Sequence, residues 1–208
     1  MQNYKATAAI LAGGKSTRFE EGDKINIKVN NIHIIDYLIK SIPNDLNIIV
    51  NTNSNGIEAT KNKLTIVKDI HEGYLGPLSG IYSSMMWAII NDPESTHILS
   101  IPIDNPLISL GQINKLIKLS KNHPSKIIIS SWNTSTNPVF GIWPIEMNNK
   151  LNEDISNGAR SIEEWSKNNG RLLVNYISYT DPFININTID DLKSLQFRLS
   201  ISSSKKIM

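Results

Sequence analysis

The chain has 208 residues, 40% of them hydrophobic, which is enough for one domain with a substantial core. Its net charge of +2, with scattered Lys and Arg residues, lacks the dense basic patch that nucleic-acid binding needs. It has no cysteine, which excludes disulfides, thiol catalysis and cysteine-based zinc sites, and its four histidines lack the spacing of metal ligands.

The N-terminal region carries no long apolar stretch. Its apolar run over residues 6–12 is too short for the core of a signal peptide or for a membrane span. We therefore expect a soluble cytoplasmic protein with no membrane partner, and we expect it to act as a monomer.

The first predicted element is a strand over residues 6–12, which leads directly into Gly13 and Gly14. Glycines leave room for main-chain N–H groups to converge on an anion. Three cationic side chains follow closely: Lys15, Arg18 and Lys24. Together these features are typical of a loop that binds a polyphosphate. The alternative is an ordinary strand-end turn with solvated basic residues.

Two common phosphate-binding motifs do not fit this loop. A Walker P-loop would need its first glycine at Ala9, inside the predicted strand. The dinucleotide fingerprint, counted from Gly13, would need glycines where Lys15 and Arg18 stand. The loop is therefore of a third kind.

Further along the chain, apolar runs alternate with helical spacing. The runs predict strands over residues 47–52, 65–68, 97–102, 126–131 and 183–187. Helical spacing covers residues 78–89, 110–117, 162–165 and 189–195. This alternation predicts an α/β fold, a three-layer αβα arrangement around a mostly parallel, Rossmann-like sheet. We assign residues 1–196 to a single domain and residues 197–208 to a frayed C-terminal tail.

Polar side chains follow the carboxyl ends of several predicted strands, where ligands bind in sheets of this kind. They are Asn51, Asp69, Asp104, Asn185 and Asn187. A single carboxylate with phosphate oxygens is the usual way to hold Mg²⁺, so Asp104 is the candidate metal ligand; a helix N-cap or turn residue is the alternative. Asp69 either accepts N–H groups of a base or caps the following loop. In the strand over residues 183–187, the two asparagines would share one side.

These residues together resemble the molybdenum cofactor guanylyltransferases, nucleotidyltransferases whose fold is of the nucleotide-diphospho-sugar transferase type. The resemblance extends from residue 6 to about residue 192 and rests on six blocks that occur in family order. The first is Leu-Ala-Gly-Gly-Lys-Ser-x-Arg at residues 11–18 with Asp-Lys at 23–24. The others lie at residues 50–53, 68–69, 75–80, 102–106 and 185–188.

The resemblance implies a Mg²⁺-dependent enzyme that transfers GMP from GTP to molybdopterin, releases pyrophosphate and forms a dinucleotide cofactor. It implies a nucleotide site made of Leu11, Ala12, Gly13, Gly14, Lys24, Asn51, Asp69 and Asp104. Arg18, Lys24 and Asp104 would be catalytic, with Lys24 on the phosphates and Asp104 on the metal. Candidates for the second substrate are Asn137, Arg160, Asn185 and Asn187. Molybdopterin-handling or acceptor enzymes are candidate partners, and nucleic acid is not.

The choice of base depends on Gly13. The related cytidylyltransferases have Leu-Ala-Ala-Gly where this chain has Leu-Ala-Gly-Gly, and a methyl group at Gly13 would crowd a purine. Two alternatives stay open: a related nucleotidyltransferase that uses CTP or a sugar-phosphate acceptor, and a non-catalytic GTP-binding protein. The presence of both Lys24 and Asp104 argues against the second.

The chain departs from the family pattern at three places. Glu20 and Glu21 stand where a glycine is expected, and their charge should weaken phosphate binding unless both point to solvent. Asn137 replaces the histidine of a His-Pro pair on the pterin side. Arg160, in a Gly-Ala-Arg-Ser segment, either meets the molybdopterin phosphate or is an exposed residue in the first turn of a helix.

Overall fold

The computed structural model describes residues 4–13, 26–54, 64–73, 75–179, 181–183, 185–186, 190–191, 193 and 195. Several sequence-based predictions therefore lie outside the described residues: those for Gly14, Lys15, Arg18, Glu20, Glu21, Lys24, Asn187 and the tail over residues 197–208. In the part of the chain that is described, no helix has both the length and the apolar character needed to span a bilayer.

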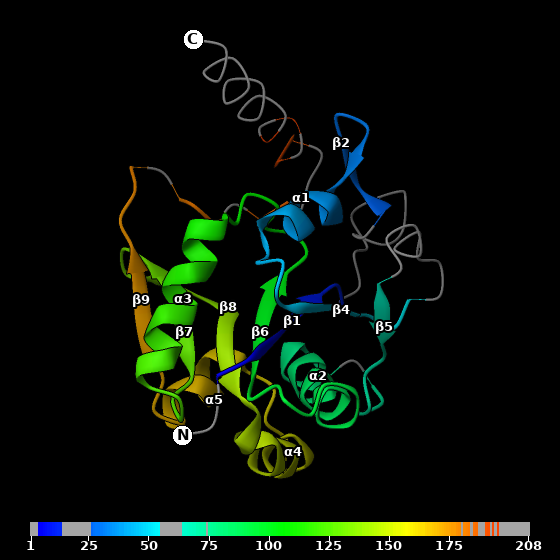
Figure 1. Ribbon diagram of the computed structural model, residues 1–208, viewed down its shortest axis with the longest axis vertical. Helices are drawn as coiled ribbons and strands as arrows, with labels where there is room; N and C mark the ends of the chain where they lie inside the picture. Colours follow the sequence, from blue (N-terminus) through cyan, green and yellow to red (C-terminus); the bar gives the residue numbers. More distant parts are fainter. Residues whose placement is uncertain are drawn as a thin grey trace.

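A seven-stranded sheet runs through the centre of the molecule (Figure 1), with the strand order β5-β4-β1-β6-β8-β7-β9. The strands are β1 (Ala6–Leu11), β4 (Asn47–Asn51), β5 (Thr65–Val67), β6 (His97–Pro102), β7 (Ile128–Trp132), β8 (Ser135–Pro144) and β9 (Leu172–Tyr176). Strand β1 pairs in parallel with β4 and β6, as do β4 with β5 and β7 with β9. Strand β8 runs antiparallel to both of its neighbours. The predicted, mostly parallel sheet is confirmed.

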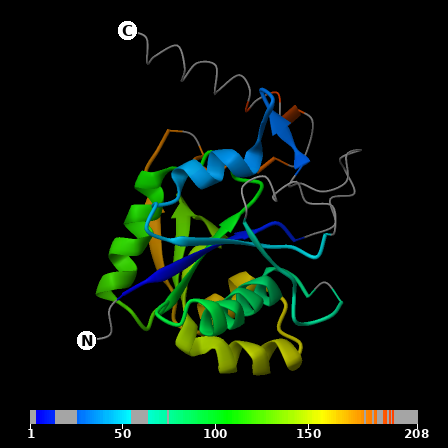
Figure 2. The ribbon, with the colours of Figure 1, turned by 45° about the vertical axis from the view of Figure 1, so that its right-hand side comes forward.

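Helices cover both faces of this sheet (Figure 2). Helices α1 (Ile34–Ser41) and α3 (Leu110–Asn122) contribute to the core on one face, and α2 (Pro77–Asn91), α4 (Asn148–Ser156) and α5 (Ile162–Asn168) to the core on the other. Successive residues of a strand point to opposite faces, so Ala8 and Ile10 of β1 join the first core while Ala9 and Leu11 join the second. Burial on both faces explains the continuous apolar run of β1, and the three-layer αβα arrangement is confirmed.

The parallel strands end together at one edge of the sheet, which we call the carboxyl edge. Leu11 is in register with Asn51 of β4 and Pro102 of β6, and Asn51 is in register with Val67 of β5. The backbone contacts continue beyond these ends, since Ile103 N donates to Leu11 O at 3.1 Å. The residues that follow each strand are therefore brought to one place.

Strand β8 is distorted where it reaches the carboxyl edge. The register of its pairing with β7 shifts before Ser130, which leaves residues 138–140 as a bulge. Two hydroxyls satisfy carbonyls of this irregular stretch: Ser130 Oγ donates to Asn137 O at 3.0 Å, and Ser100 Oγ donates to Val139 O at 2.7 Å. The bulge brings Asn137 and Val139 of the antiparallel strand to the edge where the parallel strands end.

A small hairpin before α1 was not predicted from the sequence. Strands β2 (Lys28–Val29) and β3 (Ile32–His33) pair antiparallel as a separate two-stranded sheet. The turn between them is Asn30-Asn31, with φ of 51° and 63°. Asparagine tolerates positive φ at both central positions of a tight hairpin turn, so this dipeptide was the available signal.

The strand predicted over residues 183–187 is wrong for residues 183, 185 and 186, the part of it that the structure describes. The described residues of this segment lie outside the strands. Ile186 N donates to Asp104 O at 2.9 Å, and none of the described residues of this segment belongs to a strand ladder. Phe183 N donates to Asp181 Oδ1 at 2.8 Å, a local contact that competes with strand pairing. The argument that two asparagines share one side of a strand therefore loses its basis.

Candidate nucleotide-binding site

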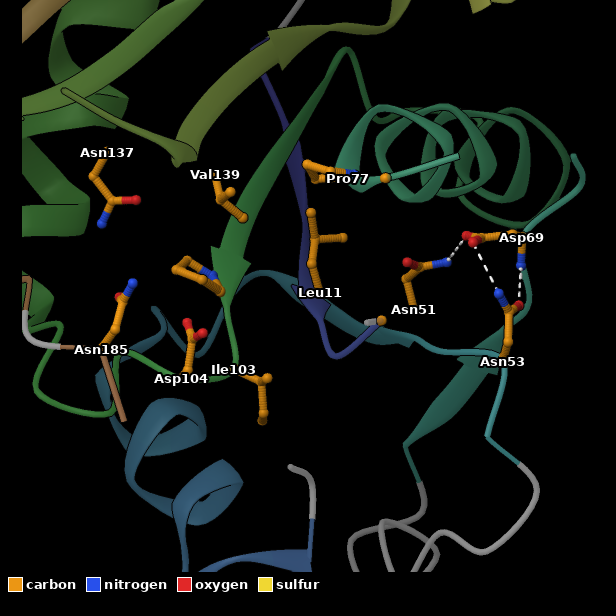
Figure 3. Close-up of a pocket in the computed structure, with 13 residues that line it drawn as sticks. Leu11, Asn51, Asn53, Asp69, Pro77, Ile103, Asp104, Asn137, Val139 and Asn185 are labelled. Atoms are coloured by element: carbon orange, nitrogen blue, oxygen red, sulfur yellow. Dashed lines mark hydrogen bonds between the residues drawn. The ribbon is translucent and has the colours of Figure 1, made fainter. Parts of the chain in front are cut away.

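A cavity of about 400 Å³ opens at the carboxyl edge (Figure 3). Its lining includes seven of the predicted site residues: Leu11, Gly13, Asn51, Asp69, Asp104, Asn137 and Asn185. The other lining residues are Asn53, Gly76, Pro77, Pro102, Ile103 and Val139. The structure thus gathers most of the predicted site that it describes into one cavity.

The polar lining residues form two groups at opposite ends of the cavity, with apolar residues between them (Figure 3). One group, which we call the clamp, consists of Asn51, Asn53 and Asp69. The other, the Asp104 end, consists of Asp104, Asn137 and Asn185. Such a cavity suits an elongated ligand with different polar groups at its two ends.

The clamp holds the carboxylate of Asp69 by both of its oxygens. Asn51 Nδ2 donates to Asp69 Oδ1 and Asn53 Nδ2 donates to Asp69 Oδ2, each at 2.9 Å. Asp69 N donates in return to Asn53 Oδ1 at 2.9 Å. A carboxylate oxygen carries two lone pairs, so one amide contact on each oxygen leaves capacity to accept hydrogen bonds from a ligand.

The alternative that Asp69 caps the loop after it receives no support. The side-chain bonds of Asp69 run back to the end of β4, whereas the next amide, Ile70 N, donates to Ser83 Oγ at 2.9 Å. The N-cap of α2 is Gly76, and it has no side-chain capping bond. The carboxylate of Asp69 is therefore oriented by the clamp.

Glycines on two elements border the side chain of Asn51, which is only 3% exposed. A Cβ atom on Gly80 of α2 would clash with Asn51 Oδ1, so the Asn51 side chain can keep this position only beside a glycine. A Cβ atom on Gly13 would lie 3.9 Å from the same oxygen, an ordinary contact. Space beside Gly13 therefore belongs to the cavity. Ala12 lies next to it but does not line the cavity, and its N–H donates to Asn51 O at 2.9 Å.

Asp104, at the other end, lies in the turn that follows β6. The next helix, α3, has Ser109 as its N-cap, with a capping box formed by Gln112. The N-cap alternative for Asp104 is therefore wrong, whereas its position in a turn is confirmed. The bond from Ile186 N to Asp104 O holds the segment that carries Asn185 beside this turn.

The side chains at the Asp104 end fit Mg²⁺. They offer a carboxylate and the amide oxygens of Asn137 and Asn185, and oxygen is the ligand atom that Mg²⁺ prefers. Among the residues that the structure describes, no three His, Cys, Asp or Glu side chains gather to form a metal cage. One carboxylate combined with substrate phosphates is the usual arrangement for Mg²⁺. Asp104 therefore fits a metal that binds together with a nucleotide.

Arg160 is not part of the cavity. Its guanidinium donates to Ile155 O at 2.8 Å and Ala159 O at 2.7 Å, near the C-terminal end of α4, and lines a separate groove. It precedes α5, whose N-cap is Ser161. Its backbone is closer to the site, because Arg160 O lies 3.6 Å from where a Cβ of Gly76 would be.

Sequence reasoning did not single out the remaining lining residues as site residues. A signal existed for Asn53, which follows Asn51 by two positions at the end of a strand and so points to the same side. The apparent signal for Pro77 was only that of a helix start. Val139 reaches the cavity through the bulge in β8, which nothing in the sequence indicated.

Comparison with known proteins places this cavity in a family. Residues 8–171 match the model of the MobA-like NTP transferase domain. The molybdenum cofactor guanylyltransferase of Haemophilus influenzae (strain 86-028NP) is 30% identical over 188 residues, which cover 90% of this chain and 95% of the relative.

Solved structures show the same fold. Molybdopterin-guanine dinucleotide biosynthesis protein A from Archaeoglobus fulgidus superposes with a TM-score of 0.72 and 19% identity, covering 93% of this chain and 98% of that chain. The 4-diphosphocytidyl-2C-methyl-D-erythritol synthase of Anaerococcus prevotii superposes with a TM-score of 0.69 and 13% identity, covering 95% of this chain and 96% of that chain. The sheet, the cavity at its carboxyl edge and the family match over residues 8–171 lead to one conclusion: this chain belongs to the MobA-like NTP transferase family and is a nucleotidyltransferase.

Proposed function

We propose that this protein transfers GMP from GTP to molybdopterin, releasing pyrophosphate and forming molybdopterin guanine dinucleotide. The observation that carries the proposal is the division of the cavity into the clamp at one end and the Asp104 end at the other. The family match and the guanylyltransferase relatives support it. In this assignment Asn51 and Asp69 hold the guanosine, and Asp104 lies at the phosphates.

The glycine loop is proposed to bind the phosphates of GTP. Leu11 and Gly13 line the cavity where the loop begins. Gly14 and the cations Arg18 and Lys24 follow in the sequence, outside the described residues, and we assign them to the same phosphates. Main-chain N–H groups and cations both favour the negative charge that builds up on the departing pyrophosphate.

The proposed reaction needs no nucleophilic side chain. An oxygen of the terminal phosphate of molybdopterin forms a bond to the α-phosphorus of GTP, and the bond from that phosphorus to the bridging oxygen of pyrophosphate breaks. A phosphate monoester is already ionised near neutral pH, so no base has to remove a proton. The protein then has to position both substrates and stabilise charge, as in other phosphoryl transfers.

Mg²⁺ is the cofactor that we propose for Asp104. When bound, it would neutralise charge on the phosphate oxygens of GTP. Asp104 would hold it with its carboxylate, and the asparagines nearby, Asn137 and Asn185, are proposed to face the acceptor. Arg160 and Asn187 remain further candidates for the acceptor side, Arg160 only if its side chain leaves the carbonyl groups that it contacts.

A related nucleotidyltransferase that uses CTP is the second candidate, because the cytidyl-named synthase of Anaerococcus prevotii shares the fold. A panel of nucleotides separates the two. We expect Mg-GTP to stabilise the protein by about 2.7 kcal/mol at a concentration one hundred times its Kd, and to stabilise it more than Mg-CTP or Mg-ATP at the same concentration. Pyrophosphate release should require both GTP and molybdopterin. Equal stabilisation by all three nucleotides would overturn the guanine assignment. Pyrophosphate release from a mixture of CTP and molybdopterin, without GTP, would overturn it as well.

A further inference from the structure

We propose that Asn53 determines the base specificity of this site as a positioning residue: it holds the carboxylate of Asp69 so that both oxygens face the N1–H and N2–H groups of guanine. The proposal rests on the assignment of GTP as the donor nucleotide. It adds a residue that acts through Asp69 and does not itself contact the base.

The contacts of Asn53 are concentrated on one neighbour. Its Nδ2 donates to Asp69 Oδ2 and its Oδ1 accepts from Asp69 N, both at 2.9 Å. The two bonds close a ring between the end of β4 and the chain after β5, so they fix both the backbone and the carboxylate of Asp69. Asn53 also lines the cavity, as does Asp69 itself (Figure 3).

The two asparagines of the clamp bind different oxygens of the Asp69 carboxylate. Asn51 is 3% exposed and donates to Asp69 Oδ1 and, at 3.2 Å, to Val67 O. Asn53 holds the opposite oxygen, Oδ2. The terminal torsion of an aspartate is broad, so one contact leaves the carboxylate plane free to turn. With a contact on each oxygen, the plane is fixed.

A fixed carboxylate plane matches guanine and excludes the other common bases. Guanine presents two neighbouring donors, N1–H and the 2-amino group, and a carboxylate accepts both in parallel. Adenine and cytosine present one donor beside an acceptor, whose lone pair would face a carboxylate oxygen. Hypoxanthine lacks the 2-amino group, and xanthine replaces it with a carbonyl oxygen. These bases are therefore the probes of this contact.

The first test compares GTP with ITP in wild type and in Asn53→Ala. Wild type should prefer GTP by about tenfold or more, since ITP lacks one of the two hydrogen bonds to the charged carboxylate. In Asn53→Ala this preference should shrink about tenfold, through KM rather than kcat, because the variant leaves the Asp104 end intact. Thermal stabilisation by each nucleotide, without an acceptor, gives the same ratio independently of transfer.

The second test reverses one bond of the clamp. Asn53→Asp alone places two carboxylates together, and Asp69→Asn alone places two amide NH₂ groups together, so each single variant should lower Tm. In the double variant N53D/D69N, the amide at position 69 donates to the carboxylate at position 53, so the hydrogen bond forms again in the reverse direction. This variant should recover most of the lost Tm. Its amide at position 69 can accept from N1–H and donate to the xanthine carbonyl. The double variant should therefore prefer XTP to GTP.

Asn47→Ala is the matched control, because Asn47 Nδ2 donates to the carboxylate of Asp92, at 2.8 Å, at the opposite edge of the sheet. It should lower Tm and leave the ratio of GTP to ITP unchanged. An unchanged ratio in Asn53→Ala, or a double variant that still prefers GTP, would overturn the proposal. Failure of the proposed function would give a different result. No dinucleotide would form with any nucleotide, whereas the ratio of GTP to ITP binding could still be measured by thermal stabilisation.

Discussion

An aspartate whose carboxylate accepts from asparagine lies at each end of the parallel strands: Asp69 at the carboxyl edge and Asp92 at the opposite edge. The two carboxylates differ in how many hydrogen bonds they accept. At the carboxyl edge, Asp69 receives two amide donors and borders the cavity. At the opposite edge, Asp92 is 5% exposed and receives four donors from Lys5, Thr7, Asn47 and Ser95.

This difference separates binding from stability. Burial alone would raise the pKa of Asp92, but the donors, Lys5 first among them, outweigh it and lower that pKa to about 2. A carboxylate surrounded in this way has little capacity left for a ligand and ties the strands together instead. The Asp69 carboxylate, bound only by neutral amides in the described contacts, keeps acceptor capacity toward the cavity.

The largest expected effect is at the opposite edge of the sheet, on Asp92 and its donors. Asp92→Ala removes the acceptor that Thr7, Asn47 and Ser95 share, and leaves Lys5 Nζ with its longer contact to Glu94 Oε2 at 3.3 Å. Because each buried donor left unsatisfied costs about 1–3 kcal/mol, the free energy of unfolding should fall by about 3–5 kcal/mol. Urea unfolding of the variant measures this. Its nucleotide selectivity, below the melting temperature, should equal that of wild type. Wild-type stability would show that the network contributes nothing.

Asp104→Ala should have the opposite profile. Transfer should fall by about 10²–10³-fold, the usual cost of removing one group that stabilises transition-state charge, while the Tm should fall less than in Asp92→Ala. Single-turnover kinetics with molybdopterin and a Mg²⁺ titration measure this. Asp45→Ala, an exposed aspartate at a distance from the cavity, serves as the control. Full activity in Asp104→Ala would remove Asp104 from the proposed metal site.

Gly80→Ala tests how closely α2 packs on the clamp. The new Cβ would clash with Asn51 Oδ1, so Asn51 must move, with an expected cost of about 1–3 kcal/mol in stability and weaker GTP binding.

Gly13→Ala is the variant to compare with it, because the new Cβ would lie 3.9 Å from Asn51 Oδ1, an ordinary contact distance. It should fold like wild type and lose affinity for GTP more than for CTP. Calorimetric titration with both nucleotides checks this pair, and equal losses in the two variants would contradict the distinction.

The smallest expected effect is the pH dependence of stability. The pKa of Asp92 is about 2 in the folded protein, below its ordinary value. The unfolded state therefore binds the proton more readily, so the stability that this group contributes is present at neutral pH and is lost as pH falls from about 5 toward 2. Urea unfolding at several pH values measures the loss. In Asp92→Asn the slope over this range should be smaller, and an unchanged slope would assign it to other carboxyl groups.

Local patterns in the sequence predicted strands β1, β4, β5, β6 and β7 and the main part of the cavity, but not strands β8 and β9. Strands β1, β4, β5 and β6 are apolar runs, and parallel strands end at one edge, so polar residues such as Asn51 and Asp104 had to come together there. What the sequence could not show depends on contacts between distant residues. The bulge that brings Val139 to the cavity and the pairing of Asn47 with Asp92 are of this kind.

One prediction failed because a local contact outweighed an apolar pattern. Residues 183–187 alternate apolar and polar side chains like a strand, yet the described part of the segment is held by one backbone bond to Asp104 and by the side chain of Asp181. Similarly, the clamp could be predicted in part, since Asn51 and Asp69 follow strands. The role of Asn53 became visible only when both of its bonds to Asp69 were seen.

The most direct test of this division of roles compares the thermal unfolding of Asp69→Ala and Asp92→Ala, each with and without GTP. Without nucleotide, Asp69→Ala should lower the unfolding temperature less than Asp92→Ala does, because Asn51 keeps its bond to Val67 O. It should lose the stabilisation by GTP. Asp92→Ala should unfold at a much lower temperature and keep the full shift. Loss of the GTP shift in Asp92→Ala, or its retention in Asp69→Ala, would contradict the account.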